Sequence, residues 1–257
     1  MKIASVIPCL NEADYLGPVL ESLKLAHITR NLVISNKFGF YHMSKEKGKT
    51  AEIARHYNAE YIEGEFGNEA QTRNTFIQLL QNEGYDYVAI VDADEVHDPL
   101  ELLKLIEAIE KNGSQPAFIR TGNMFTYFKY PTYQIVPQEK LAPVFLLRSD
   151  IRFLTIREIA RDIPGVFLPT YPLYHFSYAR QDAKIKEKLE NFEHKDEIVP
   201  NWFEEVFLKW HPEMTNIHPT HPSAYGQAVF APPPANVMAL LEKHGSKWVK
   251  DSLKVRV

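Results

Sequence analysis

Two aspartates, Asp92 and Asp94, have the type and spacing best suited to chemistry, and they follow an apolar run in the sequence VAIVDADE. Side chains two residues apart share one face of a strand, so both carboxylates are expected to point into one crevice. Open α/β sheets bind their ligands beyond the carboxyl ends of the strands. Two carboxylates there repel each other unless a cation lies between them, and Mg²⁺ or Mn²⁺ meets that need. Alternatively, the two acids only begin the loop before the next helix.

Polar residues also follow or occupy two other predicted elements. The sequence VIPCLNE places Pro8, Asn11 and Glu12 at the end of the first apolar run. The sequence GNEAQTRN places Arg73 in the helical pattern that precedes the acidic strand. Asn11 is equally suited to cap the helix expected from about residue 13, and Arg73 could instead form a surface ion pair.

Taken together and in this order, the three motifs resemble those of inverting family 2 glycosyltransferases with the GT-A fold. That family carries a strand ending P-x-x-N-E, a helix of G-x-x-x-A-R-N character and an apolar strand ending D-x-D. The resemblance covers about residues 1–112. It implies that Asp92, Ala93 and Asp94 lie against the donor, with Asp92 on the nucleotide or ribose side. Asp94 would bind the Mn²⁺ or Mg²⁺ ion that holds the donor's diphosphate.

The same resemblance implies a surface for the donor nucleotide. Pro8, Asn11 and Glu12 would border the nucleobase and ribose, and Arg73 would lie along the donor pocket. Such transferases commonly end the second strand with an aspartate that holds the base, whereas here this strand offers Ser35 and Asn36. The amide of Asn36 can both donate and accept, which is compatible with uracil, so a UDP-sugar is the favoured donor.

A second segment, RFLTIREIARDIPGVFLPTYPLYHFSYAR, is similar to one in which a glutamate after a basic residue is followed by a strand ending H-x-S-Y. This likeness implies that Glu158 is the catalytic base and that His175 is a metal or diphosphate ligand. Asp162 is a rival for the base. An inverting transfer needs one carboxylate near the acceptor hydroxyl to take its proton. The alternative for His175 is a hydrogen-bonded core residue.

Basic side chains cluster shortly after this strand. Arg180, Lys184, Lys186 and Lys188 could contact phosphate, but a lysine-rich helical face is usually solvated, and this is our interpretation. The Pro-, His- and aromatic-rich stretch 200–234 is expected to wrap over the core without regular elements.

Two groups of side chains in that stretch could have a function. His218 and His221 have a spacing that permits metal binding, yet no cysteine or acidic partner makes a zinc site convincing. A Pro-stiffened lid or acceptor-side loop is the favoured interpretation. Trp202, Trp210 and Tyr225 could stack on a sugar ring, with core packing as the alternative.

The positioning elements follow from hydrophobic periodicity. Short apolar runs alternate with helical patterns over the first half, which predicts an α/β fold with a mixed, mostly parallel central sheet flanked by helices, Rossmann-like as in GT-A. Asp98 followed by Pro99 marks the start of a helix. Strand patterns without helices over 116–153 predict antiparallel or mixed strands at one side of the sheet.

The remaining chain is expected to form an extension. We assign residues 1–180 to the nucleotide-sugar-binding and catalytic domain. Residues 181–257 are assigned to a helical and irregular extension that packs on it. The last predicted helix spans about 235–251, with apolar side chains at helical spacing.

Composition narrows the function classes. The net charge is −4 and the basic residues are spread out, so nucleic acid is not an expected partner. The only cysteine, Cys9, cannot form an intramolecular disulfide, which fits a reducing compartment. We find no apolar run of about 18 residues and no leader pattern. A cytoplasmic protein without a transmembrane anchor is expected.

The leading hypothesis is a metal-dependent transfer of a sugar to a glycan or small-molecule hydroxyl. A Q-x-x-R-W pattern is absent from the sequence, which favours single addition over processive synthesis. A nucleotidyltransferase would need a glycine-rich turn after the first strand, and PCLNEADYLG has none. A non-catalytic protein that binds a nucleotide sugar or a glycan remains an alternative.

Overall fold

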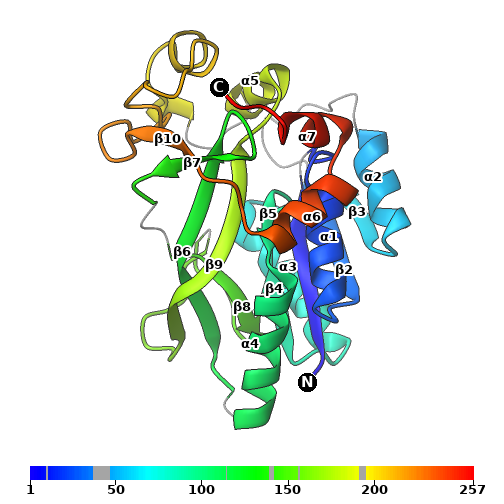
Figure 1. Ribbon diagram of the computed structural model, residues 1–257. Coiled ribbons are helices and arrows are strands. Elements are labelled where there is room, and N and C mark those ends of the chain that lie inside the picture. Colours follow the sequence, from blue (N-terminus) through cyan, green and yellow to red (C-terminus); the bar gives the residue numbers. More distant parts are fainter. Residues whose placement is uncertain (10, 37–46, 114, 139–141, 156, 191–194) are drawn as a thin grey trace.

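Strands and helices alternate through the first half of the chain in the computed structural model (Figure 1). It describes residues 1–257 except 10, 37–46, 114, 139–141, 156 and 191–194. The first elements are β1 (Ile3–Pro8), α1 (Leu16–Leu25), β2 (Arg30–Asn36), α2 (Lys47–His56), β3 (Glu60–Gly64), α3 (Glu69–Asn82), β4 (Tyr87–Ile90), β5 (Glu95–His97) and α4 (Pro99–Asn112). The later ones are β6 (Phe118–Phe128), β7 (Tyr133–Val136), β8 (Val144–Arg148), β9 (Val166–Tyr178), α5 (Asp182–Glu190), β10 (Gln227–Phe230), α6 (Ala235–His244) and α7 (Lys247–Ser252).

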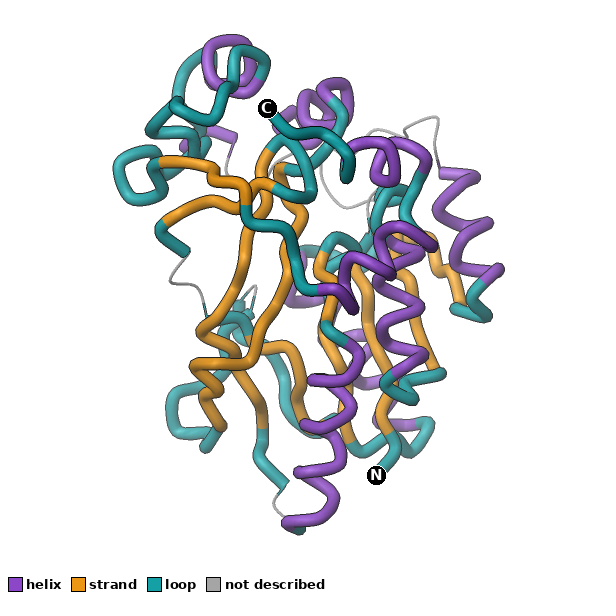
Figure 2. The backbone as a smooth tube through the Cα atoms, viewed as in Figure 1, coloured by secondary structure: helices purple, strands orange, loops and turns teal. Residues whose placement is uncertain are grey.

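The strands form one mixed sheet, in the order β10-β7-β6-β8-β4-β1-β2-β3. Strands β4, β1, β2 and β3 are parallel neighbours, whereas β8 is antiparallel to both β4 and β6. The long strands β6 and β9 lie side by side (Figure 2) and pair in parallel, and β9 also pairs with β5. The predicted mixed α/β fold is therefore confirmed, including the antiparallel strands expected after residue 116.

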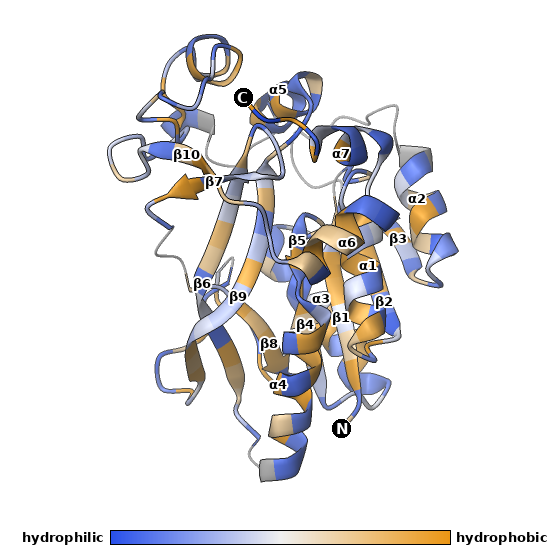
Figure 3. Cartoon of the chain, viewed as in Figure 1, coloured by the Kyte–Doolittle hydropathy of each residue, from blue (hydrophilic) through white to orange (hydrophobic). Residues whose placement is uncertain are grey.

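Both faces of the parallel strands are covered, which explains their continuous apolar runs. In β1, Val6 packs with Ile77 of α3, and its neighbour Ile7 packs on the opposite face with Leu20 of α1. The apolar colouring of the central strands in Figure 3 follows from this burial. The carboxyl ends of β1, β2 and β4 consequently meet at one edge of a rigid sheet.

The start of α4 agrees with the sequence pattern. The carboxylate of Asp98 accepts hydrogen bonds from the backbone N–H groups of Leu100 and Glu101, and Pro99 occupies the first turn. The helix ends at Gly113, whose φ of 60° suits glycine. This prediction of a capped helix is confirmed.

The predicted cap of α1 is wrong. The helix begins at Leu16, its N-cap residue is Tyr15, and no side-chain hydrogen bond caps it. Asn11 lies several residues earlier with a φ of 54°, and its side-chain amide donates to Glu187 at 2.9 Å. Asn11 therefore joins the loop between β1 and α1, called the first loop below, to α5 instead of capping a helix.

The last predicted helix is divided in two. Helix α6 ends as the N–H of Gly245 donates to the carbonyl of Leu241, and α7 starts anew with Ser246, whose hydroxyl accepts from the Val249 N–H at 3.3 Å. A β-carbon at Gly245 would lie 2.5 Å from the Leu241 carbonyl oxygen, so this break needs a glycine. The Gly-Ser pair ends one helix and caps the next.

The C-terminal stretch packs against the sheet. Trp202 and Trp210 are buried in an apolar cluster with Phe128 of β6, so their core reading is confirmed. Strand β10 pairs antiparallel with β7, which contradicts the expectation of an entirely irregular stretch, because an edge strand of the sheet was available for pairing. His218 Nδ1 accepts from the N–H groups of Thr220 and His221 and stabilises a local turn. Among the described residues, none of the helices is both long and apolar enough to cross a membrane.

His97 gives the fold an acid-sensitive point. Its ring is 1% exposed, Nδ1 lies 2.8 Å from the Tyr171 hydroxyl, and within the described residues Nε2 has no hydrogen-bond partner. Burial, and secondarily Arg157, lowers the pKa of His97 to about 3. An unfolded histidine titrates near pH 6.5, so the unfolded chain takes up a proton that the folded chain does not. Between about pH 6.5 and 3 this group should remove about 1.4 kcal/mol of unfolding free energy per pH unit of acidification.

We therefore expect His97→Gln to lose less stability than the wild type between pH 7 and pH 4.5, measured by urea unfolding. His211→Gln, at an exposed site, is the control and should follow the wild type. Equal acid sensitivity of His97→Gln and the wild type would contradict the assignment.

Candidate active site

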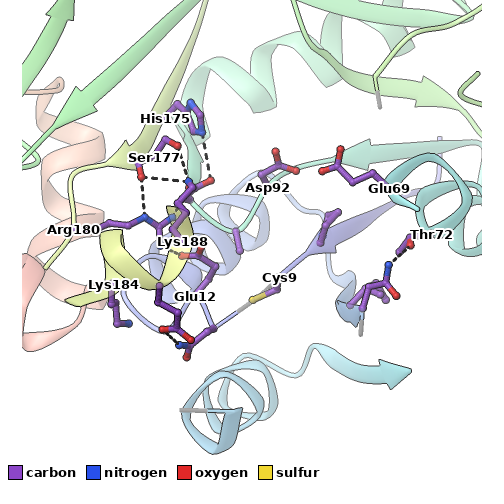
Figure 4. A pocket seen from close by; sticks show the side chains of 17 residues that line it. Cys9, Glu12, Glu69, Thr72, Asp92, His175, Ser177, Arg180, Lys184 and Lys188 are labelled. Carbon is purple, nitrogen blue, oxygen red and sulfur yellow. Dashed lines mark hydrogen bonds and ion pairs between the residues drawn. The ribbon is translucent and has the colours of Figure 1, made fainter. Parts of the chain in front are cut away.

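A cavity of about 350 Å³ opens at the carboxyl ends of β1, β2 and β4. Many of the residues singled out from the sequence line it, namely Pro8, Asn11, Glu12, Asn36, Asp92, Ala93, Asp94 and His175. In Figure 4, His175, Ser177 and Lys188 gather on one side of the cavity and Asp92 and Glu69 on the other. The topology thus joins the first loop, the acidic motif and the end of β9 in one site.

The acidic motif lies on a turn, which corrects the strand-based expectation. Strand β4 ends at Ile90, and Asp92 to Asp94 form the turn into β5, closed by a 2.9 Å hydrogen bond from the Glu95 N–H to the Asp92 carbonyl. The two carboxylates line one cavity but contact separate sets of cations. The chain turns at this point because β5 leaves the direction of β4 and pairs with β9.

Asp94 is the more buried of the two aspartates, with 7% of its side chain exposed. Its Oδ2 accepts from Arg180 and lies 3.3 Å from Lys188 Nζ. Its Oδ1 lies 3.6 Å from His175 Nε2, which is too long for a hydrogen bond. The carboxylate therefore has a cation-bound oxygen and another that faces an imidazole.

Burial alone would raise the pKa of Asp94, but Lys188, His175 and Arg180 outweigh it and hold this pKa well below its usual range. Burial is also the main reason why the pKa of Glu12, which accepts from Arg180, is raised. Asp94 is thus ionised at neutral pH and available as a ligand.

Asp92 belongs to a second network. Its Oδ1 lies 3.1 Å from Arg73 Nη2 and 3.0 Å from Arg157 Nη2. Arg157 also donates two hydrogen bonds, of 2.9 and 2.8 Å, to the carboxylate of the buried Glu95. Burial raises the pKa of Asp92, but Arg157 and then Arg73 reverse this and lower it. Arg73 has 1% of its side chain exposed and pairs with both Asp92 and Glu69. It is not among the residues that line the cavity, so its guanidinium supports the donor-side wall from within the protein.

Asn36 uses its amide within the protein. Its Nδ2 donates to the Gly67 carbonyl at 2.6 Å and to Thr72 Oγ1 at 2.8 Å, and its Oδ1 accepts from the Phe66 N–H at 3.0 Å. These bonds fasten the end of β2 to the start of α3. Asn36 therefore shapes the wall of the cavity beside Thr72, which also lines it.

The two candidates for the base lie outside this cavity. Glu158 is exposed and accepts from Thr155 Oγ1 at 3.1 Å, and Asp162 is exposed as well. Neither belongs to the cavity lining. Glu158 nevertheless directly follows Arg157, which contacts Asp92. The loop that carries both candidates is thereby attached to the acidic motif.

The solvated-face interpretation is wrong for three of the four basic residues. Lys186 is exposed, but Arg180, Lys184 and Lys188 line the cavity, with 3%, 12% and 26% of their side chains exposed. Lys184 and Lys188 are four residues apart and share one face of α5. That spacing was visible in the sequence, whereas the site opposite this face was not.

The parallel strands of this mixed α/β sheet end at a charged cavity, which is where open α/β sheets bind their ligands. Residues 5–165 match the sequence profile described as Glycosyl transferase family 2, which is more than half of the 257 residues. The chain therefore belongs to glycosyl transferase family 2, as its motifs indicated.

Solved structures show weaker likeness. S. aureus TarS 1–349 is 15% identical with a TM-score of 0.46, over 69% of this chain and 61% of that one. Its complex with UDP is 13% identical with a TM-score of 0.46, over 74% and 63%. A CMP:2-keto-3-deoxy-manno-octonic acid synthetase complexed with CTP is 9% identical with a TM-score of 0.39, over 76% and 100%. The chain thus spans less than two thirds of TarS 1–349, and no curated protein matches it.

Proposed function

We propose that this protein transfers a sugar from a nucleotide-diphosphate sugar to an acceptor hydroxyl, with inversion and in single additions. The observation that carries the proposal is the cavity in which Asp94, His175 of β9, Arg180 after β9 and Lys188 of α5 converge. When the diphosphate leaves, negative charge builds up on its oxygens. Preorganised positive and hydrogen-bonding groups around it stabilise that charge. Family membership supports the reaction class.

We further propose that Asp94 and His175 hold a divalent cation, Mn²⁺ or Mg²⁺. The distance of 3.6 Å between Asp94 Oδ1 and His175 Nε2, which form no hydrogen bond, supports this proposal. The described residues contain no group of three or more His, Cys, Asp or Glu side chains that could hold a metal, so Asp94 and His175 would supply only part of its ligands. A carboxylate oxygen with an imidazole nitrogen is a donor set that suits Mn²⁺, and carboxylate and phosphate oxygens suit Mg²⁺. When bound, the ion would neutralise charge on the departing diphosphate.

The proposed base is Glu158, with Asp162 as its rival. It would take the proton of the acceptor hydroxyl as the acceptor oxygen attacks the anomeric carbon from the face opposite the diphosphate. Arg157 would keep the loop of the base next to Asp92, through the contacts with Asp92 and Glu95. The acceptor would be a glycan or a small molecule with a free hydroxyl.

The test is a calorimetric titration of UDP-, GDP-, CMP- and dTDP-sugars in Mn²⁺, in Mg²⁺ and in EDTA, with a UDP-sugar first. We expect one nucleotide to bind in the presence of metal and binding to fall when EDTA removes it. A protein that binds no nucleotide sugar under any of these conditions would overturn the proposal. Binding without slow donor hydrolysis or transfer would favour a non-catalytic binding protein.

A further inference from the structure

Helix α5 presents one charged face to the cavity. Lys184, Glu187 and Lys188 stand at positions i, i+3 and i+4 and all line it, while Ile185 is buried in the apolar cluster of the C-terminal stretch. Lys184 Nζ lies 3.2 Å from Asp14 Oδ2. Together with the bond between Glu187 and Asn11, these contacts fix α5 over the first loop.

Two cations share Oδ2 of Asp94, and they differ in how firmly they are held. Arg180 also donates from Nε to the Ser177 carbonyl at 2.9 Å and from Nη1 to Glu12, so its planar guanidinium is fixed on three sides. Lys188 Nζ donates to Ser177 Oγ at 2.7 Å and lies 3.3 Å from both the Ser177 carbonyl oxygen and Asp94 Oδ2. Its ammonium sits on a flexible stem and can change partners by rotamer changes alone.

The ammonium of Lys188 is therefore placed where it would weaken the binding of a metal ion to Asp94. A divalent cation at Oδ1 would meet a positive charge already paired with the same carboxylate, and like charges in a partly buried site repel. A diphosphate in the same cavity would offer Lys188 a stronger partner, since ammonium groups bind phosphate oxygens as point charges. A metal ion would thus repel the ammonium of Lys188, whereas a diphosphate would attract it.

We propose that Lys188 is an internal counter-ion of Asp94 that moves to the donor's diphosphate, so that metal and nucleotide bind strongly only together. This inference rests on the proposed function and adds a diphosphate-binding residue and a binding order to it. Without nucleotide, Lys188 competes with the metal for Asp94. With nucleotide, Lys188 leaves Asp94 to the metal and contacts phosphate.

The test measures Mn²⁺ binding by electron paramagnetic resonance and nucleotide binding by calorimetry in Lys188→Met, Lys188→Gln and Lys188→Arg. UDP and UMP are the probes, or GDP and GMP if the titration of donors selects guanine. In Lys188→Met, Mn²⁺ alone should bind roughly tenfold tighter and UDP roughly tenfold weaker, within the usual range of coupling between sites. UMP, which lacks the second phosphate, should lose less.

Lys188→Gln keeps a donor for Ser177 and removes the charge, so it should behave like Lys188→Met even if the latter folds poorly. Lys188→Arg should restore the coupling between Mn²⁺ and UDP. Lys186→Met, on the exposed face of the same helix, should match the wild type. Unchanged or weaker Mn²⁺ binding in both uncharged variants would overturn the proposal that Lys188 is the counter-ion of Asp94. If the wild type still binds nucleotide, that result would not affect the proposed function. A wild type that binds no nucleotide would overturn both.

Discussion

Asp94→Asn should lower the rate of sugar transfer by roughly 10³-fold, because removal of a preorganised charge at the leaving group commonly costs that much. Asp94 faces His175 with one oxygen and Arg180 with the other, so the variant would lose the proposed metal ligand and the counter-ion of Arg180 at once. Nucleotide binding in Mn²⁺ should fall with the rate. The measurement is steady-state transfer with the donor that the titration identifies, alongside calorimetry.

The same substitution should also reduce stability. It leaves the buried Arg180 with Glu12 as its remaining carboxylate partner, and breaking a buried ion pair costs about 3–5 kcal/mol. Asp150→Asn is the matched control, because Asp150 pairs with Arg148 at an exposed site and should change stability by less than about 0.5 kcal/mol. Turnover of Asp94→Asn within a few-fold of wild type would contradict the role given to Asp94.

Glu158→Gln should reduce kcat by roughly 10²- to 10⁴-fold, the usual contribution of a general base, and leave the Kd of the donor unchanged. The side chain lies on the exposed loop outside the cavity, so neither donor binding nor stability should depend on its charge. Stopped transfer with intact donor binding would distinguish a catalyst from a binding protein. The measurement is kcat from initial rates, with Kd from calorimetry.

Asp162→Asn is the companion variant. Asp162 is exposed on the same loop, so it serves as a matched control if Glu158 is the base. Normal turnover in Glu158→Gln with lost turnover in Asp162→Asn would transfer the role to Asp162. Normal turnover in both would exclude a base from this loop.

Local sequence patterns predicted the parts of the fold that local physics controls. The apolar runs of the parallel strands and the cap at Asp98 follow from periodicity or motif. The strand assignment of Asp92 to Asp94 failed, because tertiary pairing of β5 with β9 turns the chain there. Periodicity cannot detect such a turn.

Contacts distant in sequence were beyond prediction. Glu95 and Arg157 are 62 residues apart, and no local pattern relates them. The inward face of α5 was misassigned because helical spacing shows which residues share a face but not what lies opposite. Asp94, the partner that turns Lys188 inward, lies 94 residues earlier in the chain.

The most direct test of the central claim is a crystal structure with Mn²⁺ and the nucleoside diphosphate that binds best. We predict an anomalous peak that contacts Asp94 and His175, with the diphosphate against Lys188 and the nucleoside toward Asp92 and Pro8. A nucleotide bound away from the cavity at the ends of β1 and β4, or bound there with no metal on Asp94, would contradict the account.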